Sequence, residues 1–204
     1  MYSLEKLHLS FTKKSNELLL LFDRIVSEPK SLERDILIEA LFLKIIIHWE
    51  NFLEESFLSC LCKGRSKSGK IIKPIIPTQK NKDNAFKRLS PNRRGRESEY
   101  LDWLDFNKLK DRCNDFFHHH SRIHFIYANP EIISQIQIIR NHIAHNSYKS
   151  LKKFREKIIS SYGYLPVVDA DVVDVLVATN RETSKIFYNY YISQLFDLAK
   201  YLTK

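Results

Sequence analysis

Residues that break regular structure or crosslink a chain are scarce in this sequence of 204 residues. It has 4 glycines and 6 prolines, which are too few for the many tight turns of an all-β fold. Three cysteines, Cys60, Cys62 and Cys113, are too few and odd in number for a disulfide framework, which indicates a reducing compartment. The single residue between Cys60 and Cys62 also differs from the ligand spacing of a structural zinc site.

Long apolar runs are missing as well. The apolar stretches at residues 18–22 and 45–47 are far shorter than the roughly 20 residues of a membrane-spanning helix. Residues 1–6 lack the basic and then apolar pattern of a secretory signal. We therefore expect a soluble, cytoplasmic protein that has no membrane partner.

What is present is the composition of a globular, helical protein. Hydrophobic residues make up 44% of the chain and aromatic residues 12%, which suffices for one hydrophobic core in a single domain over 1–204. Hydrophobic spacing predicts helices over about 4–28, 31–62, 97–117, 130–145, 151–160 and 169–202. The predicted fold class is therefore all-α, an up-and-down bundle of five to six helices.

Local signals place the ends and faces of these helices. Ser31 is a suitable N-cap for the second helix, and Pro130 suits the first position of the helix that follows Asn129. The second helix carries an apolar stripe at helical spacing, which we expect to face the core: Ile36, Ala40, Leu43 and Ile47. The triple histidine at 118–120 is predicted to be an exposed turn.

The basic charge is concentrated in one insertion. Segment 63–96 holds 12 of the 33 basic residues and 1 of the 24 acidic ones, so it carries about +11 while the rest of the chain is close to neutral. Its glycines and prolines predict an extended, solvated loop, with a short paired stretch around 71–76. A polyanion such as RNA and an acidic partner protein both remain candidate partners. The candidate phosphate-binding residues are Lys87, Arg88, Arg93, Arg94 and Arg96.

The strongest indication of chemistry is a short motif near the end of the helix predicted over 130–145. It contains Arg140, Asn141 and His145. Asn141 and His145 are four residues apart, so the amide can orient the imidazole. Arg140 and His145 project about 140° apart on a straight helix, and they converge only if the helix unwinds near His145.

These residue types suit cleavage of RNA without a metal. A neutral imidazole takes a proton from a ribose 2′-hydroxyl, and a guanidinium stabilises the charge that builds on the phosphoryl oxygens. The leaving 5′-oxygen needs an acid, which a second His145 in a symmetric dimer would supply. The spacing alone is weak evidence, because Arg112 and His118 form a similar pair. On spacing alone, a solvated helix end with a histidine favoured by the helix dipole explains the motif better than catalysis does.

The wider sequence resembles a known family. The run from 138 to 146 is similar to the Arg, four to six residues, His signature of the HEPN superfamily, with an Asn after the Arg as in its ribonuclease branches. Residues 48–55 and 100–104 are similar to bacterial HEPN domains of the RiboL-PSP-like type. The resemblance covers about 1–62 and 97–204 and excludes the basic insertion.

This resemblance implies a helical homodimer whose motifs face a shared cleft. It also implies a metal-independent endoribonuclease that forms a 2′,3′-cyclic phosphate, acting as a toxin or phage-defence effector with a possible antitoxin or defence partner. Arg140 and His145 take the catalytic positions, with Asn141 and Glu50 in support. Glu50 continues the apolar stripe of the second helix, so we expect it to face other helices, and a structural ion pair explains it equally well. Some toxin members have a Tyr two residues after the His. That position is Ser147 in this sequence, and Tyr148 lies one residue further on, so Tyr148 has no clear role.

A metal site and a non-catalytic module are the two alternatives to this function. A metal site would require ligands at a suitable spacing from His142 and His145, and no carboxylate or cysteine is so placed, so we expect neither metal nor other cofactor. The second class of function is a non-catalytic HEPN module that dimerises and binds nucleic acid or a partner protein while its motif serves structure.

Overall fold

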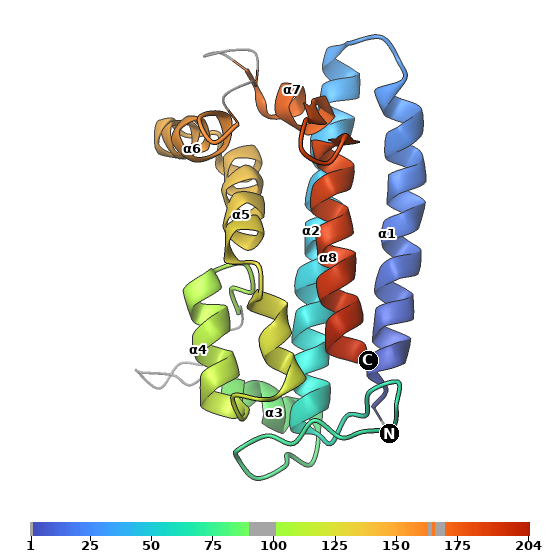
Figure 1. The fold of residues 1–204 in the computed structure, drawn as a ribbon, viewed down its shortest axis with the longest axis vertical. Helices are drawn as coiled ribbons and strands as arrows, with labels where there is room; N and C mark the ends of the chain where they lie inside the picture. Colours follow the sequence, from blue (N-terminus) through green and yellow to red (C-terminus); the bar gives the residue numbers. More distant parts are fainter. Residues whose placement is uncertain (1, 90–100, 163–164, 166–169) are drawn as a thin grey trace. The chain divides into compact units, whose positions relative to one another are not determined.

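The structure, a computed structural model, describes residues 2–89, 101–162, 165 and 170–204, and it is all-α as predicted (Figure 1). The described part contains eight α-helices, more than the five to six predicted, together with short 3-10, π-helical and β segments. The elements are α1 (Leu4–Val26), α2 (Leu32–Leu61), α3 (Lys82–Leu89), α4 (Phe106–Phe116), η1 (Arg122–Tyr127), α5 (Pro130–His145), α6 (Tyr148–Phe154), η2 (Arg155–Ile159), α7 (Val172–Val177), β1 (Thr179–Asn180), β2 (Lys185–Ile186) and α8 (Phe187–Thr203). None of the helices in these ranges combines the length and apolar composition that crossing a membrane requires.

The chain divides into two compact units. The first unit comprises 1–12, 49–130 and 197–204, and the second comprises 13–48 and 131–196. Helices α1, α2 and α8 each contribute a segment to both units. Because these three helices continue from one unit into the other, the division does not test the predicted single domain.

Aromatic side chains form the centre of the second unit. The rings of Phe22 on α1 and Tyr188 on α8 stack in parallel with centroids 3.8 Å apart, and Phe42 on α2 meets Tyr188 edge-on. All three side chains are fully buried, so this cluster holds α1, α2 and α8 side by side in this unit (Figure 1).

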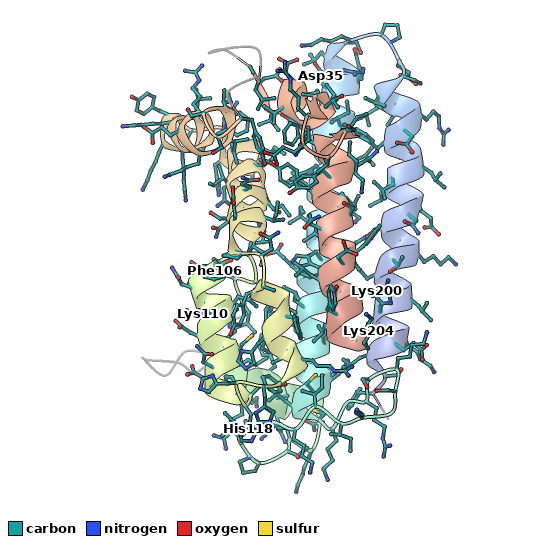
Figure 2. The ribbon with its side chains drawn as sticks, viewed as in Figure 1. Asp35, Phe106, Lys110, His118, Lys200 and Lys204 are labelled. Carbon is teal, nitrogen blue, oxygen red and sulfur yellow. The ribbon has the colours of Figure 1, made fainter. Side chains whose placement is uncertain are left out.

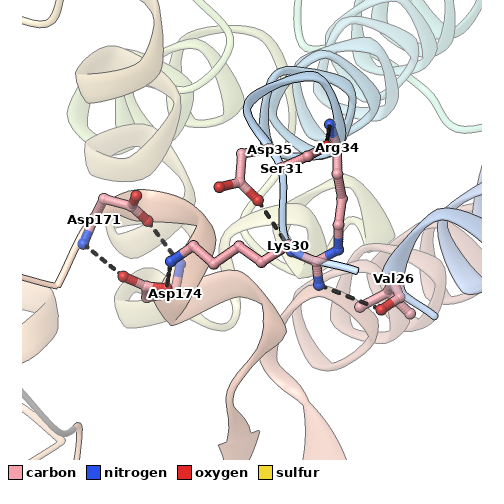
Figure 3. A network of polar contacts seen from close by, with 7 residues as sticks. All are labelled: Val26, Lys30, Ser31, Arg34, Asp35, Asp171 and Asp174. Atoms are coloured by element: carbon pink, nitrogen blue, oxygen red, sulfur yellow. Dashed lines mark hydrogen bonds and ion pairs between the residues drawn. The ribbon is translucent and has the colours of Figure 1, made fainter. Parts of the chain in front are cut away.

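Polar contacts fix the corner between α1 and α2 in the same unit (Figure 3). The Ser31 hydroxyl accepts a hydrogen bond from the Arg34 amide, which confirms Ser31 as the N-cap of α2. Lys30 pairs with Asp174 on α7 at 2.7 Å, and hydrogen bonding to that carboxylate raises the pKa of Lys30. Asp171 and Asp174 form a reciprocal capping box at the start of α7.

The predicted core stripe of α2 is wrong. Ile36 and Ile47 are 55% and 46% exposed, whereas the buried side chains include Ile38, Phe42 and Ile45. The cause is the composition of the helix, since residues 36–38 and 45–47 are uninterrupted apolar runs that offer more than one stripe at helical spacing.

The first unit contains the end of α2 and the insertion that follows it. Trp49 and Phe52 on α2 pack against Phe11 on α1. Helix α2 ends where Lys63 adopts a left-handed φ of 62° and the Gly64 amide donates to the Ser59 carbonyl at 2.6 Å. A Cβ at Gly64 would lie 2.7 Å from that carbonyl oxygen, so the close approach requires glycine.

The described part of the insertion, residues 63–89, is more ordered than the predicted loop. It contains helix α3, which buries Ala85 and Leu89. The helix begins after Asn81, whose side chain accepts a hydrogen bond from the Asn84 amide. Pairing does occur, but Ile71 pairs with Arg65, and residues 74–75 pair with the end of α4 at 116–117. The paired stretch expected around 71–76 therefore pairs with residues outside it, at Arg65 and at 116–117.

Two predicted helices are shorter than expected. Helix α4 begins at Phe106, and residues 101–105 before it are not helical, because Asp102 accepts from the Asp105 amide and Asp105 caps the helix through the Lys108 amide. The first residues of the predicted helix, 97–100, lie outside the described residues. The C-terminal helix is interrupted between α7 and α8 by a hairpin of β1 and β2. The buried Asn180 side chain accepts from the amides of Glu182 and Thr183, and these bonds stabilise the turn.

Candidate functional site

Helix α5 positions the candidate motif in the second unit. It begins at Pro130, as predicted, and buries Ile132, Ile136 and Ile139 along one face. The helix stays regular through His145, its last residue. Arg140 and His145 therefore leave α5 about 140° apart, and no unwinding brings them together.

Arg140 and Asn141 contact each other directly. Arg140 Nη1 donates to Asn141 Oδ1 at 3.1 Å, and both side chains are half-buried. The amide oxygen of Asn141 accepts from the guanidinium, and among the described residues no hydrogen bond joins Asn141 to His145. Asn141 thus orients Arg140, and its support of the His145 imidazole stays a prediction.

His145 lies at the exposed C-terminal end of α5. The next residue, Asn146, has a left-handed φ of 39° and its amide donates to the His142 carbonyl at 2.8 Å, which closes the helix. Ser147 then caps α6 through a reciprocal box with Ser150. The imidazole therefore projects from a sharp, well-defined corner between two helices.

The neighbouring His142 has a structural role that the sequence did not reveal. It is 7% exposed, its Nδ1 lies 3.2 Å from Ser150 Oγ, and its ring stacks on Phe154 with centroids 5.0 Å apart. Burial and then the charge of Arg155 lower the pKa of His142. His142 therefore stays neutral at physiological pH and anchors α6 to α5.

Helix α6 adds basic side chains beside the motif. Lys149, Lys152 and Lys153 are exposed on it, directly after His145 in the chain. The prediction of phosphate-binding residues did not include them, although the run 148–157 is visibly basic in the sequence. Tyr148 is 83% exposed, and nothing in its surroundings gives it a role in the site.

Glu50 is buried as expected, with 8% exposure on α2. It belongs to the first unit, whereas Arg140, Asn141 and His145 belong to the second. Its supporting role therefore stays a prediction. The apolar stripe that predicted this burial, with Ile36 and Ile47, is itself exposed, so it does not explain why Glu50 is buried.

The predicted phosphate-binding residues belong to the first unit. Lys87 and Arg88 are exposed in the last turn of α3. Arg93, Arg94 and Arg96 lie outside the described residues. Two other cations of the insertion are paired: Lys82 with Glu55, and Lys67 with Glu5 at 3.7 Å.

Other kinds of catalytic group find little support. Burial raises the pKa of the Cys60 and Cys113 thiols well above the usual range, so neither is a thiolate nucleophile at neutral pH. In the part of the chain that the structure describes, no three His, Cys, Asp or Glu residues come close enough to form a metal site.

Comparison of the chain with models of protein families, with curated proteins and with solved structures gives no match. The similarity to HEPN domains therefore depends on the motif residues and the short segments named above.

Proposed function

We propose that this chain is a metal-independent endoribonuclease that acts as a homodimer. The observation that carries the proposal is the different exposure of two histidines on α5. His142 is buried and holds the α5–α6 corner, while His145 projects into solvent one turn later. Arg140, oriented by Asn141, lies on the same helix. An accessible imidazole and a held guanidinium are the groups that phosphodiester transesterification requires.

The proposed reaction involves two proton transfers, one from the attacking 2′-hydroxyl and one to the leaving 5′-oxygen. One His145 accepts the proton of a ribose 2′-hydroxyl, and the 2′-oxygen attacks the adjacent phosphorus. The bond from phosphorus to the 5′-oxygen breaks, which leaves a 2′,3′-cyclic phosphate. The His145 of a second copy donates a proton to the departing 5′-oxygen, and Arg140 stabilises the charge on the phosphoryl oxygens.

The geometry of α5 supports the need for two copies. Since Arg140 and His145 diverge by about 140° on a regular helix, one chain does not aim both at one phosphate. In a two-fold dimer, the guanidinium of one copy can meet a phosphate together with the imidazole of the other. The exposed cations Lys149, Lys152 and Lys153 of α6 would then guide the RNA backbone towards the motif.

The test is cleavage of single-stranded RNA in the presence of EDTA. We expect wild type to cleave, and His145→Ala and Arg140→Ala each to lose at least about a hundredfold in rate. His119→Ala and Arg24→Ala are matched controls, since both residues are exposed and lie outside the motif. A fully 2′-deoxy strand should stay intact. Cleavage of that strand, or motif variants as active as their controls, would contradict the proposal.

One observation favours a non-catalytic alternative. Arg140 is half-buried and bonded to the adjacent Asn141, an arrangement that also suits a purely structural residue. In that case the chain is a dimerising module that binds nucleic acid or a partner protein. Wild type would then bind single-stranded RNA without cleaving it, and Arg140→Ala would lower thermal stability more than His145→Ala.

A further inference from the structure

A pocket of about 490 Å³ lies in the first unit, and none of its lining residues belongs to the α5 motif. It joins two features that the proposed function leaves unused, the basic insertion and the histidine turn at 118–120. Backbone pairing brings them together, because the Ile75 amide donates to the Phe116 carbonyl at 2.8 Å. Figure 2 labels His118 at the end of α4 beside the loop of the insertion.

The two walls of the pocket are held by local hydrogen bonds. On one side, a turn closes where the Gly69 amide donates to the Ser66 carbonyl, and Gly69 has a left-handed φ of 76°. On the other side, the His118 carbonyl accepts from the Ser121 amide and lies 2.9 Å from Nε2 of His124. The pocket is therefore built from fixed backbone and is not a gap between loose side chains.

The lining of the pocket carries one sign of charge. None of the described lining residues is acidic. Five of them carry cationic or imidazole side chains: Lys70, Lys73, His118, His120 and Arg122. Lys67 and Lys82 of the same insertion pair with carboxylates, but in the described part of the chain Lys70 and Lys73 have no such partner. Lys70 and Lys73 thus bring uncompensated positive charge of the insertion to this pocket.

Arg122 gives an independent indication of a ligand. Its Nη1 atom is buried and, among the described residues, has no hydrogen-bond partner. A buried guanidinium N–H without an acceptor is unfavourable, and Arg122 also lines the pocket, so a small turn of the guanidinium towards a bound anion would give this N–H its acceptor. Oxygen atoms of a phosphate match the forked donors of arginine.

The remaining lining sets the size and kind of the ligand. Ile71 and Ile72 add an apolar surface, and the rings of His118 and His120 lie nearly parallel with centroids 5.6 Å apart. The volume lies in the usual range for small-molecule sites and exceeds what a lone phosphate fills. Apolar groups and imidazole rings are suitable surfaces for a base.

We propose that this pocket binds a phosphorylated nucleotide, with the phosphate on Arg122, Lys70 and Lys73 and the base against the isoleucines and histidines. The nucleotide is either free or part of a nucleic-acid strand, since both present the same phosphate. The site is distinct from the α5 motif, and it does not depend on RNA cleavage by that motif.

Binding to the full chain is measured by calorimetry with three probes: inorganic pyrophosphate, adenosine 5′-monophosphate, and a short 2′-deoxy oligonucleotide without terminal phosphates. The deoxy strand keeps binding separate from the proposed cleavage. We expect Arg122→Gln to weaken binding about tenfold or more, and Lys70→Gln with Lys73→Gln to do the same without touching the packed backbone. Lys80→Gln is the matched control, because Lys80 is exposed in the same insertion but does not line the pocket.

Each outcome decides the proposal. Binding of the small probes that depends on Arg122 indicates a free nucleotide, and binding of the oligonucleotide alone, with the same dependence, indicates a strand. If no probe binds, or if Lys80→Gln weakens binding as much as the pocket variants do, the proposal is overturned. Wild-type binding in a chain that does not cleave RNA would contradict only the proposed function.

Discussion

The Nδ1 atom of His142 and the hydroxyl oxygen of Ser150 lie 3.2 Å apart and join the last turn of α5 to the first turn of α6. Ser150 also completes the capping box of α6 with Ser147. The corner that carries His145 therefore depends on a buried histidine three residues away. Protonation of His142 would place a charge in this contact, which has consequences for stability.

We predict that the free energy of unfolding decreases as the pH falls below about 6.5, and that His142 contributes to the decrease. Burial lowers the pKa of His142 in the folded chain, so the unfolded chain binds the proton first. The stability is fully present above the unfolded pKa of about 6.5 and is lost as the pH falls towards the lower folded pKa. Urea unfolding at pH 7.5 and pH 5.5 measures the effect.

The control for this prediction is His142→Phe, which keeps a ring against Phe154 but cannot be protonated. Burial also lowers the pKa of His8 and His48, so some pH dependence remains in the variant. The difference between wild type and variant isolates His142. If both lose the same stability between pH 7.5 and pH 5.5, His142 does not titrate as argued.

We predict that mixing wild type with His145→Ala lowers RNA cleavage more than in proportion to the dilution. If each reaction needs one His145 as base and another as acid, only wild-type dimers are active. After subunit exchange at equal concentrations, these make up about one quarter of the dimers. The initial rate should thus fall to about one quarter of that of wild type alone at the same total concentration. A rate of about one half would show that each copy acts alone.

The fold class and many helix ends follow from simple sequence signals. Ser31 caps α2 and Pro130 begins α5 because a hydroxyl acceptor and a fixed φ act locally. The break between α7 and α8 was missed because the hydrophobic pattern continues on both sides of it. The break is made by the side chain of Asn180, which accepts from the backbone of the turn. The nearby Arg181 and Glu182 occur in helices as often as in turns, so they do not mark the break in the sequence.

The sequence indicates the residues of the candidate motif but not their contacts. Spacing shows that Asn141 and His145 share a face, but it does not show that Arg140 competes for the same amide oxygen. Nor does it distinguish the buried His142 from the exposed His145, since this depends on Phe154 and Ser150 of the next helix. Pairing between the insertion and α4 is long-range, and so the pocket has no local signal.

The register of α2 can be tested by stability. We predict that Ile45→Ala lowers the free energy of unfolding by about 2–5 kcal/mol, because the side chain is fully buried. Ile47→Ala, two residues away, should lower it by a smaller amount, since that residue is 46% exposed in the single chain. Urea unfolding of both variants decides between the two stripes, and a larger loss for Ile47→Ala would restore the stripe expected from the sequence.

The exposed stripe of α2 is the surface on which we expect the second copy to pack. Leu32, Ile36 and Ile47 are exposed at helical spacing, in the same unit as the α5 motif. The proposed active site is incomplete in one chain, and an apolar helix face is what a homodimer interface buries.

The double variant Ile36→Glu with Ile47→Glu should therefore be monomeric by analytical ultracentrifugation and lose RNA cleavage. Because both side chains are exposed, the helical circular dichroism should not change. Lys13→Glu with Lys14→Glu is the control for added negative charge, since both lysines are exposed on α1. A glutamate variant that stays dimeric would place the interface elsewhere, and a monomer that still cleaves RNA would remove the need for two copies.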